Sequence, residues 1–153
     1  MNTSIETILY YTIFAGLLSI IYGYVTGVNI IKSSPGNKKM QEIALAIQIG
    51  AKAYLNRQYK TIAIVGVVVL FIITFSFSYF VGLGYLIGST LSGIAGYVGM
   101  LVSVQANVRT AEASRKGLAS GLSVAFKSGA ITGMLVAGLA LFSLVVYYFF
   151  LLK

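Results

Sequence analysis

The longest uncharged stretch of the sequence, residues 61–108, contains 48 residues without an Asp, Glu, Lys, Arg or His. The hydrocarbon core of a bilayer takes about 20 apolar residues per helix, so this stretch is too long for one crossing and suits two. The segment Gly82-Leu-Gly-Tyr85 lies near its middle, where a tight reversal of the chain would fall. The pattern therefore predicts a helical hairpin with crossings at about 61–81 and 85–108.

Two further uncharged stretches, 7–31 and 128–152, are each long enough for one crossing. Before the hairpin lies the amphipathic segment 40–57, in which apolar residues recur at helical spacing. No Pro or Gly interrupts residues 51–65, so we predict that this segment continues into the next crossing as one long rod. The alternative is a separate interfacial helix lying flat on the membrane. The pattern predicts an all-α integral membrane protein with four transmembrane helices in a single membrane domain, 1–153.

Small residues recur every four positions on the third and fourth predicted crossings. Residues four apart share one helix face, and small ones there allow two backbones to approach closely in lipid. We therefore predict that these two crossings pack tightly through their stripes, although small residues are also common in spanning helices generally. The stripes are Gly84, Gly88, Ser92 and Gly96 on the third crossing, and Gly117, Gly121, Ala125, Gly129, Gly133 and Ala137 on the fourth.

Composition agrees with a membrane protein. The chain is 58% hydrophobic and 9% charged, with a mean hydropathy of +0.92, whereas a soluble domain carries about 25% charged residues. The N-terminal segment has no basic region and carries Glu6 before its long apolar run, so we expect it to be retained rather than cleaved as a signal peptide.

The net charge of +8 does not point to nucleic acid, because the basic residues cluster between the hydrophobic runs. Six lie within residues 32–60 and four within 109–127, and the remaining one is Lys153. Basic loops stay in the cytoplasm. We therefore expect both polar segments, and the amphipathic part of the rod, on the cytoplasmic side and both termini on the other side. The localisation would be multi-pass, in the inner membrane if the cell is bacterial.

The inventory of reactive side chains is small. The chain has no Cys, His or Asp, and its three carboxylates are Glu6, Glu42 and Glu112. No predicted crossing holds an ionisable group of the kind that ion pathways use, and three scattered Glu cannot assemble a Mg²⁺ site for phosphate hydrolysis. We therefore nominate no catalytic, cofactor-binding or metal-ligating residue. A small four-helix transporter would depend on Glu6, and an accessory membrane subunit is a further alternative.

The second polar segment offers Arg109, Arg115 and Lys116. These cations could attract a phosphate group, but basic residues at this place also satisfy the positive-inside bias without any ligand. Glu112 lies three residues after Arg109 and four before Lys116, which predicts an intrahelical charge pair with either.

Several segments resemble membrane-bound inorganic pyrophosphatases. The run Met40–Tyr59, followed by Thr61-Ile-Ala-Ile-Val-Gly66, is similar to the second helix of that family. The segments Gly96-Tyr-Val-Gly-Met100, Ala106-Asn-Val-Arg-Thr-Ala111 and Gly129–Gly138 are similar to its third and fourth helices. The resemblance keeps order and spacing from Ser34 onward, with Gln105 in place of an expected Arg.

The resemblance implies a homodimeric pump of about sixteen helices that hydrolyses pyrophosphate with Mg²⁺ and moves H⁺ or Na⁺ across the bilayer. In that family the Asp-rich substrate motifs and the ion gate lie beyond the fourth helix, so no functional residue transfers to this sequence. We therefore expect residues 1–153 to be an N-terminal scaffold portion of such a pump, a fragment inactive by itself. The proton-pumping type is the most similar, and the Na⁺-pumping type is the alternative.

Overall fold

The computed structural model describes residues 3–151, which form four long α-helices. Each is long and apolar enough to cross a membrane, which confirms the predicted all-α membrane fold. The helices are α1 (Thr3–Lys32), α2 (Lys38–Ser76), α3 (Tyr79–Ser114) and α4 (Leu118–Leu151). The predicted end of the last crossing, Leu152, lies outside the described residues.

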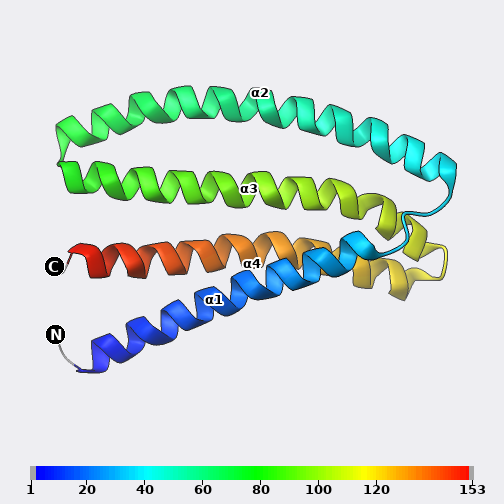
Figure 1. Ribbon diagram of the computed structural model, residues 1–153, viewed down its shortest axis with the longest axis horizontal. Coiled ribbons are helices and arrows are strands. Elements are labelled where there is room, and N and C mark those ends of the chain that lie inside the picture. Colours follow the sequence, from blue (N-terminus) through cyan, green and yellow to red (C-terminus); the bar gives the residue numbers. More distant parts are fainter. Residues whose placement is uncertain (1–2, 152–153) are drawn as a thin grey trace.

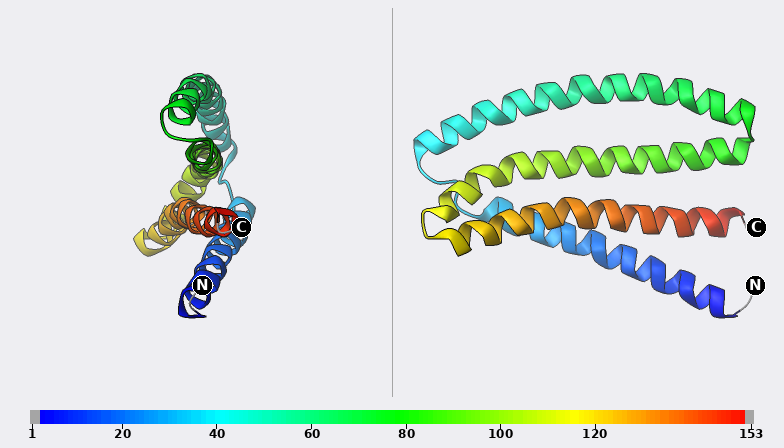
Figure 2. Two further views of the ribbon diagram at one scale, coloured as in Figure 1. Left: turned by 90° about the vertical axis from the view of Figure 1, so that its left-hand side faces the viewer. Right: turned by 180° about the vertical axis from the view of Figure 1, so that it is seen from behind.

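The helices stand side by side in an open row rather than in a closed bundle (Figures 1 and 2). Their order across the row is α2, α3, α4, α1, and within the described residues α2 packs against α3 alone. The buried cluster of Ile30, Ala106 and Ile131 lies where α1, α3 and α4 meet. Both faces of the row are therefore open along much of their length, and many large apolar side chains are exposed.

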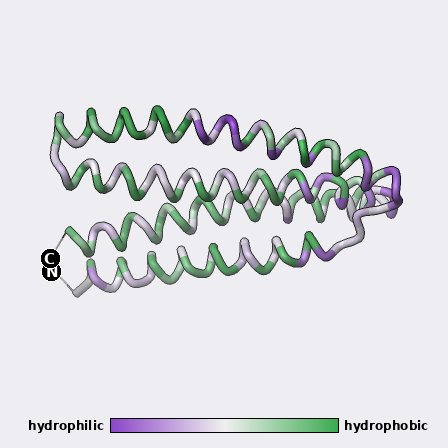
Figure 3. Tube along the Cα trace, turned by 45° about the horizontal axis from the view of Figure 1, so that its top comes forward, coloured by the Kyte–Doolittle hydropathy of each residue, from purple (hydrophilic) through white to green (hydrophobic). Residues whose placement is uncertain are grey.

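The two ends of the row differ in polarity. The start of α1, the end of α4 and the α2–α3 turn lie at one end, and the α1–α2 and α3–α4 connections lie at the other (Figure 1). Figure 3 shows hydrophilic residues at the end with the two connections, and a further hydrophilic stretch partway along α2. This distribution follows the clustering of basic residues in the sequence.

Helix α2 is continuous over 39 residues, so the predicted single rod is confirmed. Gly36, with φ of +79°, turns the chain before it, a conformation that glycine adopts without steric penalty. Asn37 is the N-cap residue, and its side-chain oxygen accepts a hydrogen bond from the Met40 backbone N–H at 3.0 Å. This cap satisfies one of the otherwise unpaired N–H groups at the start of the helix.

The predicted reversal of the hairpin at 82–85 is wrong. The chain turns at Phe77 and Ser78, and Gly82 lies inside α3. Ser78 caps α3 by accepting a hydrogen bond from the Val81 N–H at 3.3 Å. Gly82 is needed for close approach instead, because a Cβ there would lie 2.1 Å from Oγ1 of Thr74 on α2.

The second polar segment, 109–127, is helical except for a short turn. Helix α3 continues to Ser114 and α4 begins at Leu118. Gly117 adopts a φ of +129°, which allows the tight turn between the two helices. The polar segment therefore consists of the end of α3 and the start of α4.

The position of the α2–α3 turn sets the expected depth of the other residues. At 1.5 Å per residue, a hydrocarbon core of about 30 Å takes about 20 residues of each helix. Counted from the turn, this length ends near Arg57 on α2 and Val98 on α3. On this count we expect the crossing of α3 to lie closer to the turn than 85–108, with the last part of α3 beyond the membrane core.

Candidate functional site

The strongest polar contact between helices is made by Arg109 of α3. Its Nε and Nη2 donate hydrogen bonds to the Ile31 carbonyl oxygen at 3.0 and 2.6 Å, and its Nη1 donates to the Gln105 carbonyl oxygen at 2.6 Å. Partial burial lowers the pKa of Arg109 by desolvation, but an arginine stays charged at neutral pH. Ile31 lies in the last turn of α1, where backbone carbonyls lack intrahelical partners and a positive charge is favourable. Arg109 therefore fastens α3 to the end of α1, and Gln105 takes part through its backbone.

The predicted charge pair of Glu112 is found with a different partner. Arg115 Nη1 lies 3.1 Å from Glu112 Oε2, at a spacing of three residues, and the Arg115 side chain is 62% exposed. Arg109 is turned to α1 instead, and Lys116 forms no ion pair among the described residues. The predictions of Arg109 and Lys116 as partners are therefore wrong. Exposed pairs of this kind contribute about 0–1 kcal/mol.

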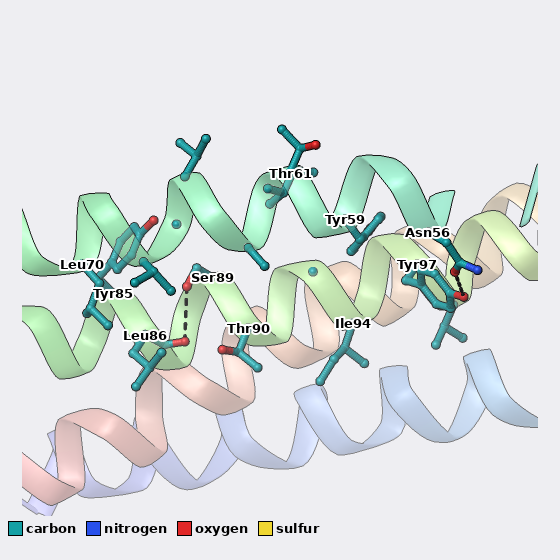
Figure 4. Close-up of a pocket in the computed structure, with 17 residues that line it drawn as sticks. Asn56, Tyr59, Thr61, Leu70, Tyr85, Leu86, Ser89, Thr90, Ile94 and Tyr97 are labelled. Carbon is teal, nitrogen blue, oxygen red and sulfur yellow. Dashed lines mark hydrogen bonds between the residues drawn. The ribbon is translucent and has the colours of Figure 1, made fainter. Parts of the chain in front are cut away.

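A second polar cluster joins α2 to α3 near the expected membrane boundary (Figure 4). The Tyr97 hydroxyl donates a hydrogen bond to Asn56 Oδ1 at 3.0 Å, and the Tyr59 and Tyr97 rings meet edge to face with centroids 5.2 Å apart. The Tyr59 hydroxyl lies over Gly96, where a Cβ would be 2.7 Å away. Amphipathic rings are favoured at this depth. This cluster was not predicted from the sequence, in which Tyr97 falls midway through the predicted crossing 85–108.

The predicted packing of α3 against α4 is confirmed, but only some of the small residues in the predicted stripes mediate it. Helices α3 and α4 do pack together, and the Tyr147 ring of α4 covers Gly84. Tyr147 also donates a hydrogen bond to the Phe80 carbonyl oxygen. However, Gly96 faces Tyr59 of α2 rather than α4. A Cβ at Gly88, Gly129 or Gly133 would meet nothing within 4 Å, so these positions do not mediate the packing.

Two further close contacts between helices lie outside the predicted stripes. A Cβ at Gly138 of α4 would lie 2.8 Å from the Gly16 carbonyl oxygen of α1. A Cβ at Gly99 of α3 would lie 2.8 Å from Cγ2 and 3.0 Å from Oγ1 of Thr132 on α4. These glycines therefore set the spacing of the row.

We expect Gly99→Ala to lower the free energy of unfolding by about 1.5 kcal/mol, because the added methyl group overpacks against Thr132. Thr132→Ala in the same chain removes both clashing atoms and is expected to restore the loss. Unfolding with SDS from detergent micelles, followed by circular dichroism, measures both. Gly88→Ala, in open space on the same helix, is the control; an equal loss in that variant would contradict the assignment.

The carboxylates do not converge. Glu6 lies in the first turn of α1, at the opposite end of the row from the α1–α2 and α3–α4 connections (Figure 1), whereas Glu42 lies near the start of α2 and Glu112 near the end of α3. Among residues 3–151 there is no group of three or more His, Cys, Asp or Glu that could hold a metal ion. What residues 3–151 do assemble is a set of polar and close contacts between helices.

Comparison with known proteins identifies the family. Residues 17–153 match the inorganic H⁺ pyrophosphatase family. The chain belongs to this family. It is 44% identical over 138 residues to a protein of Methanosarcina mazei named "K(+)-insensitive pyrophosphate-energized proton pump", covering 89% of this chain and 21% of that relative.

Other relatives of the pyrophosphatase family are likewise matched over about a fifth of their length. A protein of the same name from Caldanaerobacter subterraneus is 41% identical over 128 residues, covering 74% of this chain and 18% of the relative. A protein of Bacteroides thetaiotaomicron, provisionally named a K(+)-stimulated pyrophosphate-energized sodium pump, is 38% identical over 143 residues, covering 90% of this chain and 20% of the relative. The chain thus spans about a fifth of the length of these relatives.

Proposed function

We propose that this chain is an N-terminal scaffold portion of an ion pump in which hydrolysis of pyrophosphate drives proton transport across a membrane. The 44% identity with a relative named a proton pump, over 89% of this chain, is the observation that supports it most strongly. The open row supports the same proposal, because α2 packs only on α3 within the described residues and both faces remain available to further helices. The rest of a pump of about sixteen helices, working as a homodimer, would then pack against this row.

The proposed topology follows from charge. Both basic connections lie at one end of the row (Figure 1), and basic segments remain cytoplasmic. We therefore place this end in the cytoplasm and both termini of the chain on the opposite side. The polar continuation of α2 and α3 beyond the membrane core then projects into the cytoplasm.

The groups that act on pyrophosphate are proposed to come from outside this chain. Mg²⁺ would be held there, because residues 3–151 contain no group of three or more His, Cys, Asp or Glu that could hold it. The name of the Bacteroides relative favours Na⁺ as a second candidate for the transported ion, while relatives named proton pumps reach higher identity. An autonomous four-helix transporter is disfavoured by the family assignment and by the position of Glu6 in the first turn of α1.

We expect the purified chain in vesicles to release no phosphate from pyrophosphate with Mg²⁺. We expect proton transport to return when this chain is co-expressed with the Methanosarcina relative from which the matching part has been removed. Restored acidification of vesicles on addition of pyrophosphate, measured with a pH-sensitive dye, would support the scaffold role. Hydrolysis by this chain alone would contradict the proposal, as would a well-folded mixture that shows no transport.

A further inference from the structure

A long apolar groove runs along one side of the contact between α2 and α3 (Figure 4). Its volume is about 950 Å³, within the range of about 300–1,000 Å³ typical of small-molecule sites. Two tyrosine-on-glycine contacts separate the helices here: Tyr59 of α2 lies over Gly96, and the Tyr85 hydroxyl of α3 lies 3.7 Å from a Cβ placed on Gly66. The bulk of the two rings keeps the helices apart and leaves the groove open between them.

The groove has an apolar body and a polar end. Aliphatic side chains such as Ile62, Val67 and Ile94 line the body. Asn56 and Tyr97 line the polar end. Residues 56 to 70 of α2 border the groove, which corresponds to about 21 Å of helix. This length exceeds half of a hydrocarbon core of about 30 Å, so the groove reaches from the expected membrane boundary past the depth of one leaflet.

Two lysines flank Asn56, which lines the polar end of the groove, along α2. Lys52, Asn56 and Lys60 follow one another at four-residue spacing, and Val67 lies seven residues after Lys60, so the four share one side of α2. Lys52 and Lys60 are exposed, and neither forms an ion pair among the described residues. A positive end on an apolar groove at the membrane boundary matches a ligand with an anionic head and an apolar tail.

We propose that this groove binds the acyl chain of an anionic phospholipid, with the phosphate of its headgroup at Lys60 and Lys52. The exposed rim of the groove carries large aliphatic side chains such as Ile62 and Ile94 beside the smaller Ser89 and Thr90. A lipid suits the site better than a further protein helix, because the two lysines form no ion pair among the described residues and offer the charge that a phosphate group takes. This inference does not depend on pyrophosphate hydrolysis.

Tryptophan quenching by brominated lipids tests the proposal, because the natural chain has no Trp. Ile94→Trp puts a fluorescent side chain in the groove and serves as the groove reporter. Leu18→Trp on α1 places the matched control reporter, since both positions are 49% exposed and lie 15 residues after the first residue of their helices. In phosphatidylcholine vesicles, we expect brominated phosphatidylglycerol to quench the groove reporter about fivefold more efficiently per lipid than brominated phosphatidylcholine, and to show no such preference at the control reporter.

Adding Lys60→Gln is expected to lower the preference at the groove reporter about fivefold, while Lys127→Gln on α4, which removes the same charge away from the groove, leaves it unchanged. Circular dichroism and quenching of the control reporter verify that each variant is folded and inserted. Equal quenching of the groove reporter by both lipids would overturn the proposal, as would an equal loss in the Lys127 variant. Absence of quenching of the groove reporter by either lipid would show that lipid does not enter the groove and would overturn the proposal too.

Discussion

Gly138→Leu is expected to lower the free energy of unfolding by about 3 kcal/mol and to separate α1 from α4. A Cβ at this position would lie 2.8 Å from the Gly16 carbonyl oxygen and 2.9 Å from Cγ1 of Ile20. The nearest atom belongs to the backbone of α1, so a rotamer change cannot relieve the clash and the helix itself has to move. Overpacking of a close contact costs about 1–3 kcal/mol or more. SDS titration followed by circular dichroism measures the loss.

Gly133→Leu is the matched control, because it makes the same substitution on the same helix where a Cβ meets nothing within 4 Å. Its effect should stay within about 0.5 kcal/mol, as for other substitutions that disturb no contact. The helix spacing can be followed independently with nitroxide labels on α1 and α4, since the chain has no natural Cys. A loss in Gly133→Leu equal to that in Gly138→Leu would show that the contact between Gly16 and Gly138 is not the cause.

Arg109→Gln should lower the free energy of unfolding by about 2 kcal/mol. The substitution removes the charged hydrogen bonds to the Ile31 carbonyl oxygen and the favourable charge at the end of α1. Hydrogen bonds to charged groups contribute about 1.5–3 kcal/mol. The same SDS titration applies, and hydrogen exchange of the last turn of α1 should become faster.

Arg115→Gln provides the comparison for Arg109, because it removes an equal charge from the same polar end. Its pair with Glu112 is exposed, so the expected loss is below about 1 kcal/mol. If both arginine variants lost the same stability, net charge rather than the contact with Ile31 would explain the effect. If Arg109→Lys retained full stability, the forked geometry of the guanidinium group would be unnecessary.

The errors in the sequence-based prediction have physical causes. A glycine inside an apolar run indicates either a turn or a close helix contact, and Gly82 serves the second purpose against Thr74 while Ser78 caps the helix. Four-residue spacing shows which residues share a face but not which neighbour covers that face. Because α3 has α2 on one side and α4 on the other, its small residues divide between them: Gly96 receives Tyr59 and Gly84 receives Tyr147.

The amino-acid sequence by itself determined that the chain crosses a membrane with four helices, that α2 is one rod, and that the basic residues gather between the crossings. These properties follow from the length of each uncharged run and from the absence of helix-breaking residues, which act locally. Only the tertiary structure decided the order of the helices across the row. It also decided the hydrogen bonds from Arg109 to the Ile31 carbonyl oxygen and the groove between α2 and α3 beside Tyr59 and Tyr85. These features join residues far apart in the chain, and helical periodicity contains no information about which faces meet.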